Sequence, residues 1–178
     1  MSVEITYFVH GTTMDNIDGK ATGWLPGELS EKGIRQSIAL KEQIDITKFE
    51  IVYCSDLKRA IESAKYTFED NVEILQDSRL RECNYGVLNG KDTKQIIYEE
   101  HILEPFPQGE SMQDVENRVS AFCKELKEKY DGKKVAIVAH KAPQLALEVI
   151  CNHKTWEQAI KEDWRRTKAW QPGWIYVV

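Results

Sequence analysis

The stretch KVAIVA at residues 134–139 is an almost continuous apolar run that ends directly before His140. A short run of this kind is typical of a central strand that is covered on both faces. Further runs predict other strands of the same sheet: EITYFV at 4–9, EIVYC at 50–54, and shorter candidates at 72–75 and 174–178. The sequence therefore predicts a sheet whose middle is buried.

Helical patterns alternate with these strands. Ser30, Ser55 and Ser111 each precede such a pattern and are expected to cap a helix. The segment after Ser111 is the clearest, because its apolar residues repeat at steps of three and four. Pro143 suits the first turn of a following helix, and a last helix is expected at 155–165. The alternation predicts a three-layer α/β/α sandwich, with a mainly parallel sheet and helices on both faces.

The composition restricts the partners of the protein. The 178 residues predict one domain over residues 1–178, and 42% apolar with 30% charged residues is ordinary for a globular chain. With 24 Lys and Arg against 29 Asp and Glu, the formal net charge is −5. This charge disfavours nucleic acid and acidic membranes as partners. An anion would have to be held by a local pocket.

The cysteines and the N-terminus indicate the compartment. The sequence starts without the basic and apolar segments of a signal peptide, and no run approaches the roughly 20 apolar residues of a membrane helix. Cys54, Cys83, Cys123 and Cys151 lie far apart, which argues against a zinc site, an iron–sulfur cluster or a redox pair. We therefore expect a reduced, cytoplasmic protein without a metal or another cofactor.

Polar side chains follow three of the predicted strands. His10 and His140 each come directly after a strand, and Arg59 lies shortly after the strand at 50–54. Ligands of parallel sheets bind beyond the carboxyl ends of the strands, so two imidazoles and a guanidinium could surround one anion there. Plainer interpretations are structural histidines and an ion pair of Arg59 with Glu62 on a solvated helix face. Position alone favours the plainer interpretation of Arg59.

Six segments give a more specific indication. They are FVHGTT at 8–13, TGW at 22–24 with LSEKGIRQS at 29–37, SDLKRAIESA at 55–64, RLRECNYGVLNGKD at 79–92, PQGESMQDVENRV at 107–119 and VAIVAH at 135–140. In this order, over nearly the whole chain, they resemble the histidine phosphatase superfamily in its phosphoglycerate mutase-like branch. The resemblance implies a small phosphatase that acts on a small phosphorylated substrate and needs no metal.

The resemblance also implies a role for individual residues. His10 would attack phosphorus and form a phosphohistidine. Arg59 and His140 would stabilise the phosphate oxygens, and Glu82 would act first as a general acid and then as a general base. Further residues would contact the phosphate or the substrate: Gly11, Thr13, Asn16, Thr22, Gly23 and Lys141.

Two positions depart from the family pattern. Val9 stands where the family has an arginine directly before the nucleophile, and one charge-assisted phosphate contact is worth about 1.5–3 kcal/mol. Lys141 stands where the family has a glycine after the second histidine. Either its ammonium group replaces the missing guanidinium in part, or the lysine is solvated and only its backbone N–H faces the phosphate. We favour the solvated lysine.

Other departures concern the reaction. Cys83 stands where glycolytic mutases have a carboxylate-binding arginine, and only residues 93–107 separate two blocks that are joined by a longer insert in those mutases. A short lid admits water, which favours hydrolysis of a phosphomonoester over return of the phosphoryl group. The alternatives are a mutase and, because of Val9, a weakly active or inactive member that binds a phosphorylated ligand. The sequence leaves the ester and the oligomeric state open.

The C-terminal part of the chain is rich in tryptophan and arginine. Four tryptophans lie between residues 156 and 174, and such a cluster predicts core packing. Arg165 and Arg166 lie between them and are expected at an exposed helix end. The alternative is a clamp over the substrate.

Overall fold

A computed structural model describes residues 1–178 of the chain. Its main sheet has five strands in the order β4-β3-β6-β1-β7. The strands are β1 (Glu4–Val9), β3 (Ile51–Cys54), β4 (Ile74–Gln76), β6 (Lys134–Ala139) and β7 (Trp174–Val177). Four of them run parallel, and only β7 runs antiparallel to its neighbour β1. The predicted central strand, β6, lies in the middle of the sheet, and five of its six residues are buried.

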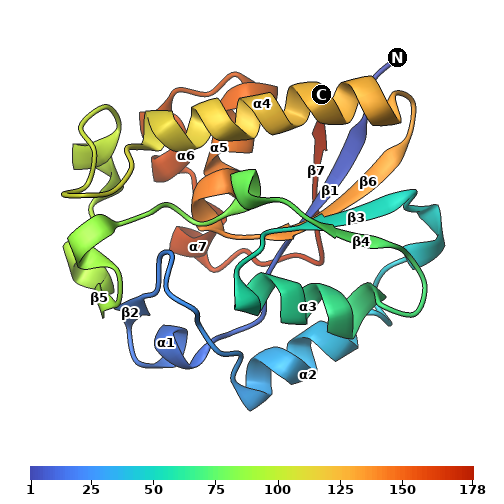
Figure 1. The fold of residues 1–178 in the computed structure, drawn as a ribbon, viewed down its shortest axis with the longest axis horizontal. Helices are drawn as coiled ribbons and strands as arrows, with labels where there is room; N and C mark the ends of the chain where they lie inside the picture. Colours follow the sequence, from blue (N-terminus) through green and yellow to red (C-terminus); the bar gives the residue numbers. More distant parts are fainter.

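Helices cover both faces of this sheet, which confirms the predicted α/β/α class (Figure 1). The helices are α1 (Met14–Ile17), α2 (Glu31–Leu40), α3 (Lys58–Phe68), α4 (Met112–Tyr130), α5 (Lys141–Asn152), α6 (Trp156–Lys161) and α7 (Trp164–Thr167). α2 and α3 pack together on one side of the sheet, and α4 and α5 pack together on the other. No helix combines the length and the hydropathy that crossing a lipid bilayer requires.

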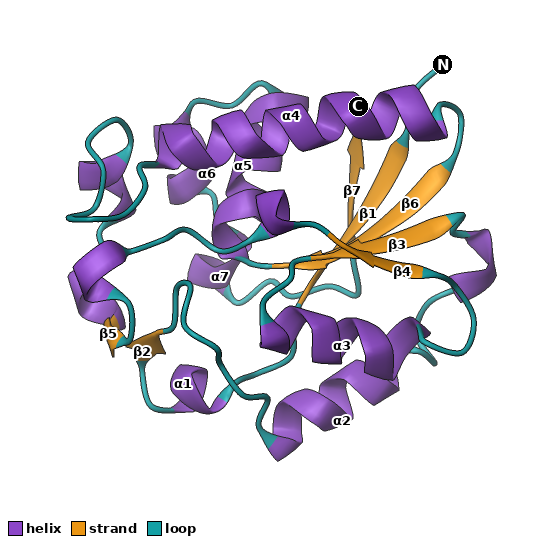
Figure 2. Cartoon of the chain, viewed as in Figure 1, coloured by secondary structure: helices purple, strands orange, loops and turns teal.

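Smaller elements lie at one side of the sheet. A second sheet consists of β2 (Lys20–Ala21) and β5 (Lys91–Asp92), and Figure 2 shows this pair with α1 apart from the main sheet. Short 3-10 turns interrupt the remaining loops: Ile46–Lys48, Ser78–Leu80, Gly86–Leu88, Thr93–Gln95 and Tyr98–His101. The long connection from β4 to α4 is therefore built mostly of turns, and it contributes β5 to the second sheet.

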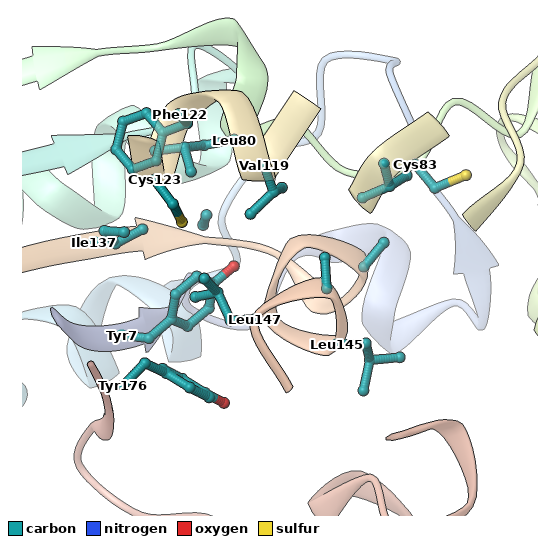
Figure 3. Packing of buried hydrophobic residues seen from close by; sticks show 14 of the residues in the cluster. Tyr7, Leu80, Cys83, Val119, Phe122, Cys123, Ile137, Leu145, Leu147 and Tyr176 are labelled. Carbon is teal, nitrogen blue, oxygen red and sulfur yellow. The ribbon is translucent and has the colours of Figure 1, made fainter. Parts of the chain in front are cut away.

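The hydrophobic core has two parts, one on each face of the sheet. The larger part contains 27 buried residues and lies between the sheet and the helices α4 and α5. Figure 3 shows how its side chains meet, with Phe122 and Cys123 of α4 over Ile137 of β6 and with Leu147 of α5 beside Tyr7 of β1. The smaller part contains nine buried residues, among them Phe68 of α3. Burial on both faces explains the continuous apolar run of β6.

Side-chain caps define most helix starts. The Ser30 and Ser111 hydroxyls each accept a hydrogen bond from the backbone N–H three residues later, as predicted. The predicted cap at Ser55 is wrong, because its hydroxyl accepts from the N–H of Leu57 in a preceding turn and α3 begins only at Lys58. The predicted last helix is split into α6 and α7, because the Asp163 carboxylate starts a new helix by accepting from the N–H of Arg165.

Candidate active site

The pairing of β1 with β6 brings two histidines together. The strands are parallel and Val9 lies opposite Ala139, so the next residue of each strand lies at the same edge of the sheet. The N–H of His10 continues the ladder by donating to the carbonyl of Ala139 at 3.1 Å. The ring centroids of His10 and His140 are 5.1 Å apart. The predicted convergence of the two imidazoles is therefore confirmed.

Both rings line a cavity of about 730 Å³, which is large enough for a small organic ligand. The charged side chains of the cavity wall are Lys20, Arg59, Lys141, Arg165 and Glu82. Four basic groups thus face one carboxylate, although the whole chain has a net charge of −5. The cavity wall is therefore locally cationic in an acidic protein, as a pocket for an anion would need.

The His10 ring has one defined tautomer. Its Nδ1 lies 2.8 Å from the carbonyl oxygen of Gly11, and since a carbonyl oxygen can only accept, Nδ1 carries the proton. Burial, and then the positive charge of Arg59, lower the pKa of His10 to about 3. The imidazole is therefore neutral at physiological pH, and Nε2 keeps its lone pair for a reaction.

His140 is more deeply buried and has no partner for its ring. Its side chain is 1% exposed, and neither ring nitrogen has a hydrogen-bond partner within the protein. Burial and the charge of Arg59 hold the pKa of His140 well below its usual value. Buried polar groups are nearly always hydrogen-bonded, so an unpartnered imidazole in a cavity wall is typical of a ligand site.

The buried neutral state of His140 predicts a pH-dependent stability. Below about pH 6.5 the unfolded chain protonates this residue while the folded protein does not, so the free energy of unfolding falls as the pH falls. Between pH 7 and pH 5, the free energy of unfolding of the wild type is expected to fall by about 2 kcal/mol more than that of His140→Gln. Urea unfolding in phosphate-free buffer measures this difference. Equal pH dependence of the two proteins would show that the folded state also protonates His140.

Arg59 is buried in the site and not solvated. Its side chain is 2% exposed, and its guanidinium donates to the carbonyl oxygens of Gly23 at 2.8 Å and Leu25 at 3.1 Å. Glu62 is paired with Lys58 instead, so the ion-pair interpretation of Arg59 is wrong. The two carbonyl bonds fix the guanidinium and leave other N–H groups for a ligand.

The segment next to Arg59 forms another wall of the cavity. Thr22 and Gly23 both line it, as their predicted role requires. The Thr22 hydroxyl donates to the Asp15 carboxylate at 2.8 Å. Gly23 has a φ of +56°, and a Cβ there would lie 1.8 Å from Oδ1 of Asn89. Only glycine fits this position, where its carbonyl meets Arg59.

The Glu82 carboxylate is fixed by backbone groups from two segments. Its Oε1 accepts from the N–H of Cys83 at 2.9 Å and from the N–H of Ala142 at 3.0 Å. Its Oε2 has no hydrogen bond within the protein, and the residue is 8% exposed. Because Ala142 lies in the first turn of α5, this bond holds the carboxylate beside His140.

Of the three residues expected to contact the phosphate after the nucleophile, two line the cavity and one does not. Gly11 lines the cavity, but its N–H already donates to the hydroxyl of Ser63 at 3.0 Å. Thr13 is fully buried and caps α1 by accepting from the N–H of Asn16, so its predicted phosphate contact is not supported. Asn16 lines the cavity, and since its Oδ1 accepts from the N–H of Thr13, its Nδ2 is free to donate.

Lys141 lines the cavity and has two neighbours within the protein. Its Nζ lies 3.5 Å from Oδ2 of Asp163, a carboxylate that is almost completely buried. The same ammonium group lies 4.7 Å from the ring centroid of Tyr98. The Lys141 side chain is 39% exposed, so it keeps contact with solvent as expected, while its ammonium group also lies beside a carboxylate and an aromatic face.

The two C-terminal arginines differ in their environment. Arg166 is exposed and pairs with Glu99, as expected for an exposed helix end. Arg165 lines the cavity and donates to Asp163 and to the side chain of Gln144. The expectation of an exposed helix end is wrong for Arg165, because α7 folds back against α5.

The tryptophans also divide into groups. Trp156 is buried in the core, as predicted. Trp164 and Trp174 stack with ring centroids 4.8 Å apart, and Trp164 reaches the cavity. Trp170 is 53% exposed and lines the cavity, so the prediction of core packing is wrong for this residue.

Arg118 shapes the site and was not expected from the sequence. The guanidinium of Arg118 donates to the carbonyl oxygens of Arg79, Arg81 and Glu82, and it pairs with Glu110 at 2.9 Å. It thereby fixes the segment that carries the Glu82 carboxylate. The available signal was its place on the apolar side of α4, where a charge is unusual.

Comparisons with known proteins identify relatives of the chain. Residues 7–153 match the histidine phosphatase superfamily (branch 1). Phosphoserine phosphatase 1 of Hydrogenobacter thermophilus is 28% identical over 157 residues, which are 82% of this chain and 74% of that protein. The 2,3-bisphosphoglycerate-dependent phosphoglycerate mutase of Bartonella tribocorum is 32% identical over 127 residues, which are 62% of this chain and 61% of that protein.

Solved structures show the same fold. A mycobacterial glucosyl-3-phosphoglycerate phosphatase superposes with a TM-score of 0.78 at 27% identity, over 88% of this chain and 85% of its own. The α-ribazole phosphatase of Shigella flexneri also superposes with a TM-score of 0.78, at 23% identity over 89% of this chain and 84% of its own. With the family match covering most of the sequence, the chain belongs to the histidine phosphatase superfamily, branch 1.

Proposed function

We propose that the protein is a phosphatase that hydrolyses a small phosphomonoester through a phosphohistidine on His10. The observation that carries the proposal is the meeting of a neutral His10, an unpartnered His140 and the Arg59 guanidinium in one cationic cavity. Phosphatases and phosphoglycerate mutases among the relatives support phosphoryl transfer as the chemistry.

In the first step, Nε2 of His10 attacks the phosphorus atom. The N–P bond forms while the bond from phosphorus to the ester oxygen breaks. Arg59 and His140 donate hydrogen bonds to the phosphate oxygens, because charge neutralisation and positioning dominate phosphoryl transfer. Glu82, in its carboxylic acid form, donates its proton from Oε2 to the leaving alkoxide, and the alcohol leaves.

In the second step, water replaces His10 on phosphorus. The Glu82 carboxylate takes a proton from the water, whose oxygen bonds to phosphorus while the N–P bond breaks. Inorganic phosphate leaves, and His10 is again neutral. The backbone bonds from Cys83 and Ala142 to Oε1 hold the carboxylate in place for both proton transfers.

Hydrolysis is favoured over mutase chemistry by two features. Cys83 is fully buried and its thiol points to backbone carbonyl oxygens, so the position next to Glu82 offers no cation for a substrate carboxylate. The connection over residues 93–107 is short, and it leaves the cavity open to the water that the second step consumes.

A panel of phosphate esters tests the proposal. It should include phosphoserine, sugar phosphates, phosphoglycerates and p-nitrophenyl phosphate, each with and without 2,3-bisphosphoglycerate. We expect release of inorganic phosphate from at least one ester without the bisphosphate. An isomerised product that requires the bisphosphate would indicate a mutase, and thermal stabilisation by esters without phosphate release would indicate a binding protein.

A further inference from the structure

One wall of the cavity lacks a charge that phosphate binding would use. Val9 lines the cavity directly before His10, and its side chain packs against the larger core. It can offer no hydrogen bond to an anion. Arg59 enters from α3, where its guanidinium is fixed to the carbonyl oxygens of Gly23 and Leu25. A second guanidinium would have to come from another element.

Arg165 is placed to supply it. The residue belongs to α7, which lies beside the beginning of α5 (Figure 1), and it lines the same cavity as His10 and His140. Its side chain is 24% exposed. Although Arg165 is 155 positions from His10 in the sequence, the two side chains face one space.

The guanidinium of Arg165 is held in one orientation. Its Nη1 donates to Oδ1 of Asp163 at 2.9 Å, and its Nη2 donates to Oε1 of Gln144 at 3.0 Å. Its Cζ lies 4.4 Å from the ring centroid of Trp164, whose indole N–H also donates to Gln144. Gln144 is buried one turn after His140 on α5. The planar group is thus fixed relative to the imidazole, as bidentate anion binding requires.

The group keeps donors and charge for a ligand. A guanidinium has five N–H groups, and two of those of Arg165 are used within the protein, so three remain. Asp163 is the carboxylate shared by Arg165 and Lys141. Two cations on one carboxylate leave an excess of one positive charge at the cavity wall.

We propose that Arg165 is a phosphate-binding residue, which supplies from the C-terminal segment the second guanidinium that Val9 cannot provide. This inference rests on the proposed function, since it assigns the residue to the same phosphate. The charge of Arg165 also contributes to the lowered pKa of His10, after burial and Arg59, which agrees with its proximity.

A purely structural role is the competing explanation. Arg165 could serve only to join α7 to α5 through Asp163 and Gln144. In that case its replacement would lower the thermal stability and leave the affinity for phosphate unchanged. Binding of inorganic phosphate to the folded protein separates the two roles, and it requires no turnover.

The direct test compares Arg165→Gln with Arg166→Gln by calorimetric titration with inorganic phosphate. Arg166 is the matched control, because it is the adjacent arginine and pairs with Glu99 outside the cavity wall. We expect about 10- to 100-fold weaker phosphate binding by Arg165→Gln, because one charge-assisted hydrogen bond is lost. We expect no change in phosphate binding by Arg166→Gln. Unchanged phosphate affinity of folded Arg165→Gln would overturn the proposal.

A rescue variant strengthens the test. Val9→Arg in the Arg165→Gln background introduces a guanidinium from the end of β1, which lines the same cavity. We expect it to restore most of the phosphate affinity without restoring the bonds to Asp163 and Gln144. Continued weak binding by the folded double variant would contradict the proposal. If no ester is hydrolysed by the wild type, the proposed function fails, while these binding measurements still decide the role of Arg165.

Discussion

Phosphate release by His10→Ala is expected to fall by at least about 10³-fold relative to the wild type, because the substitution removes the nucleophile. Nδ1 of His10 is bound to the Gly11 carbonyl, so Nε2 is the atom that attacks. His140 follows the neighbouring strand, and its buried ring is expected to bind the phosphate oxygens and not to attack phosphorus. Initial rates of phosphate release on the best ester of the panel measure the effect.

Trapping the intermediate makes this prediction specific. Wild-type protein quenched during turnover should contain acid-labile, alkali-stable phosphate on His10, and the alanine variant should contain none. His153→Asn is a suitable control, because His153 is exposed at the end of α5 with a φ of 55°, which asparagine tolerates. Phosphohistidine that persists in His10→Ala would assign the nucleophile to another residue.

The parts of the fold and site that could be predicted are those with a local pattern. The strands at 4–9 and 134–139 are marked by apolar runs, and strand–helix alternation implies that they run parallel. From these two facts alone, His10 and His140 are expected at the same sheet edge, where they meet. The family motifs then singled out Glu82, which is one acid among 29 and carries no signal by itself.

The parts that could not be predicted depend on contacts between distant segments. Arg59 is held by the carbonyl oxygens of Gly23 and Leu25, and backbone carbonyls leave no mark in a sequence. Arg165 reaches the cavity because the chain breaks its helix near Asp163 and docks α7 on Gln144. A helical pattern over 155–165 does not show that break.

The second large effect is expected for Glu82→Gln. The amide is close in shape to the carboxylate, and its oxygen can still accept from the N–H groups of Cys83 and Ala142, so the local structure should persist. The variant cannot donate a proton to the leaving oxygen. Turnover of alkyl phosphates is expected to fall by about 10²- to 10⁴-fold, the usual contribution of a general acid or base.

The choice of leaving group separates the two roles of Glu82. p-Nitrophenolate leaves without needing a proton, so Glu82→Gln should still form phosphohistidine from p-nitrophenyl phosphate. The breakdown of this phosphohistidine needs the Glu82 carboxylate as a base, which the variant lacks. Rapid mixing should therefore show a burst of about one nitrophenolate per enzyme, followed by slow release of further nitrophenolate. An equal loss on alkyl and aryl esters without a burst would make Glu82 a positioning residue. Unchanged turnover of both esters would place the proton donor elsewhere in the cavity, and the free Oε2 would then have no part in the reaction.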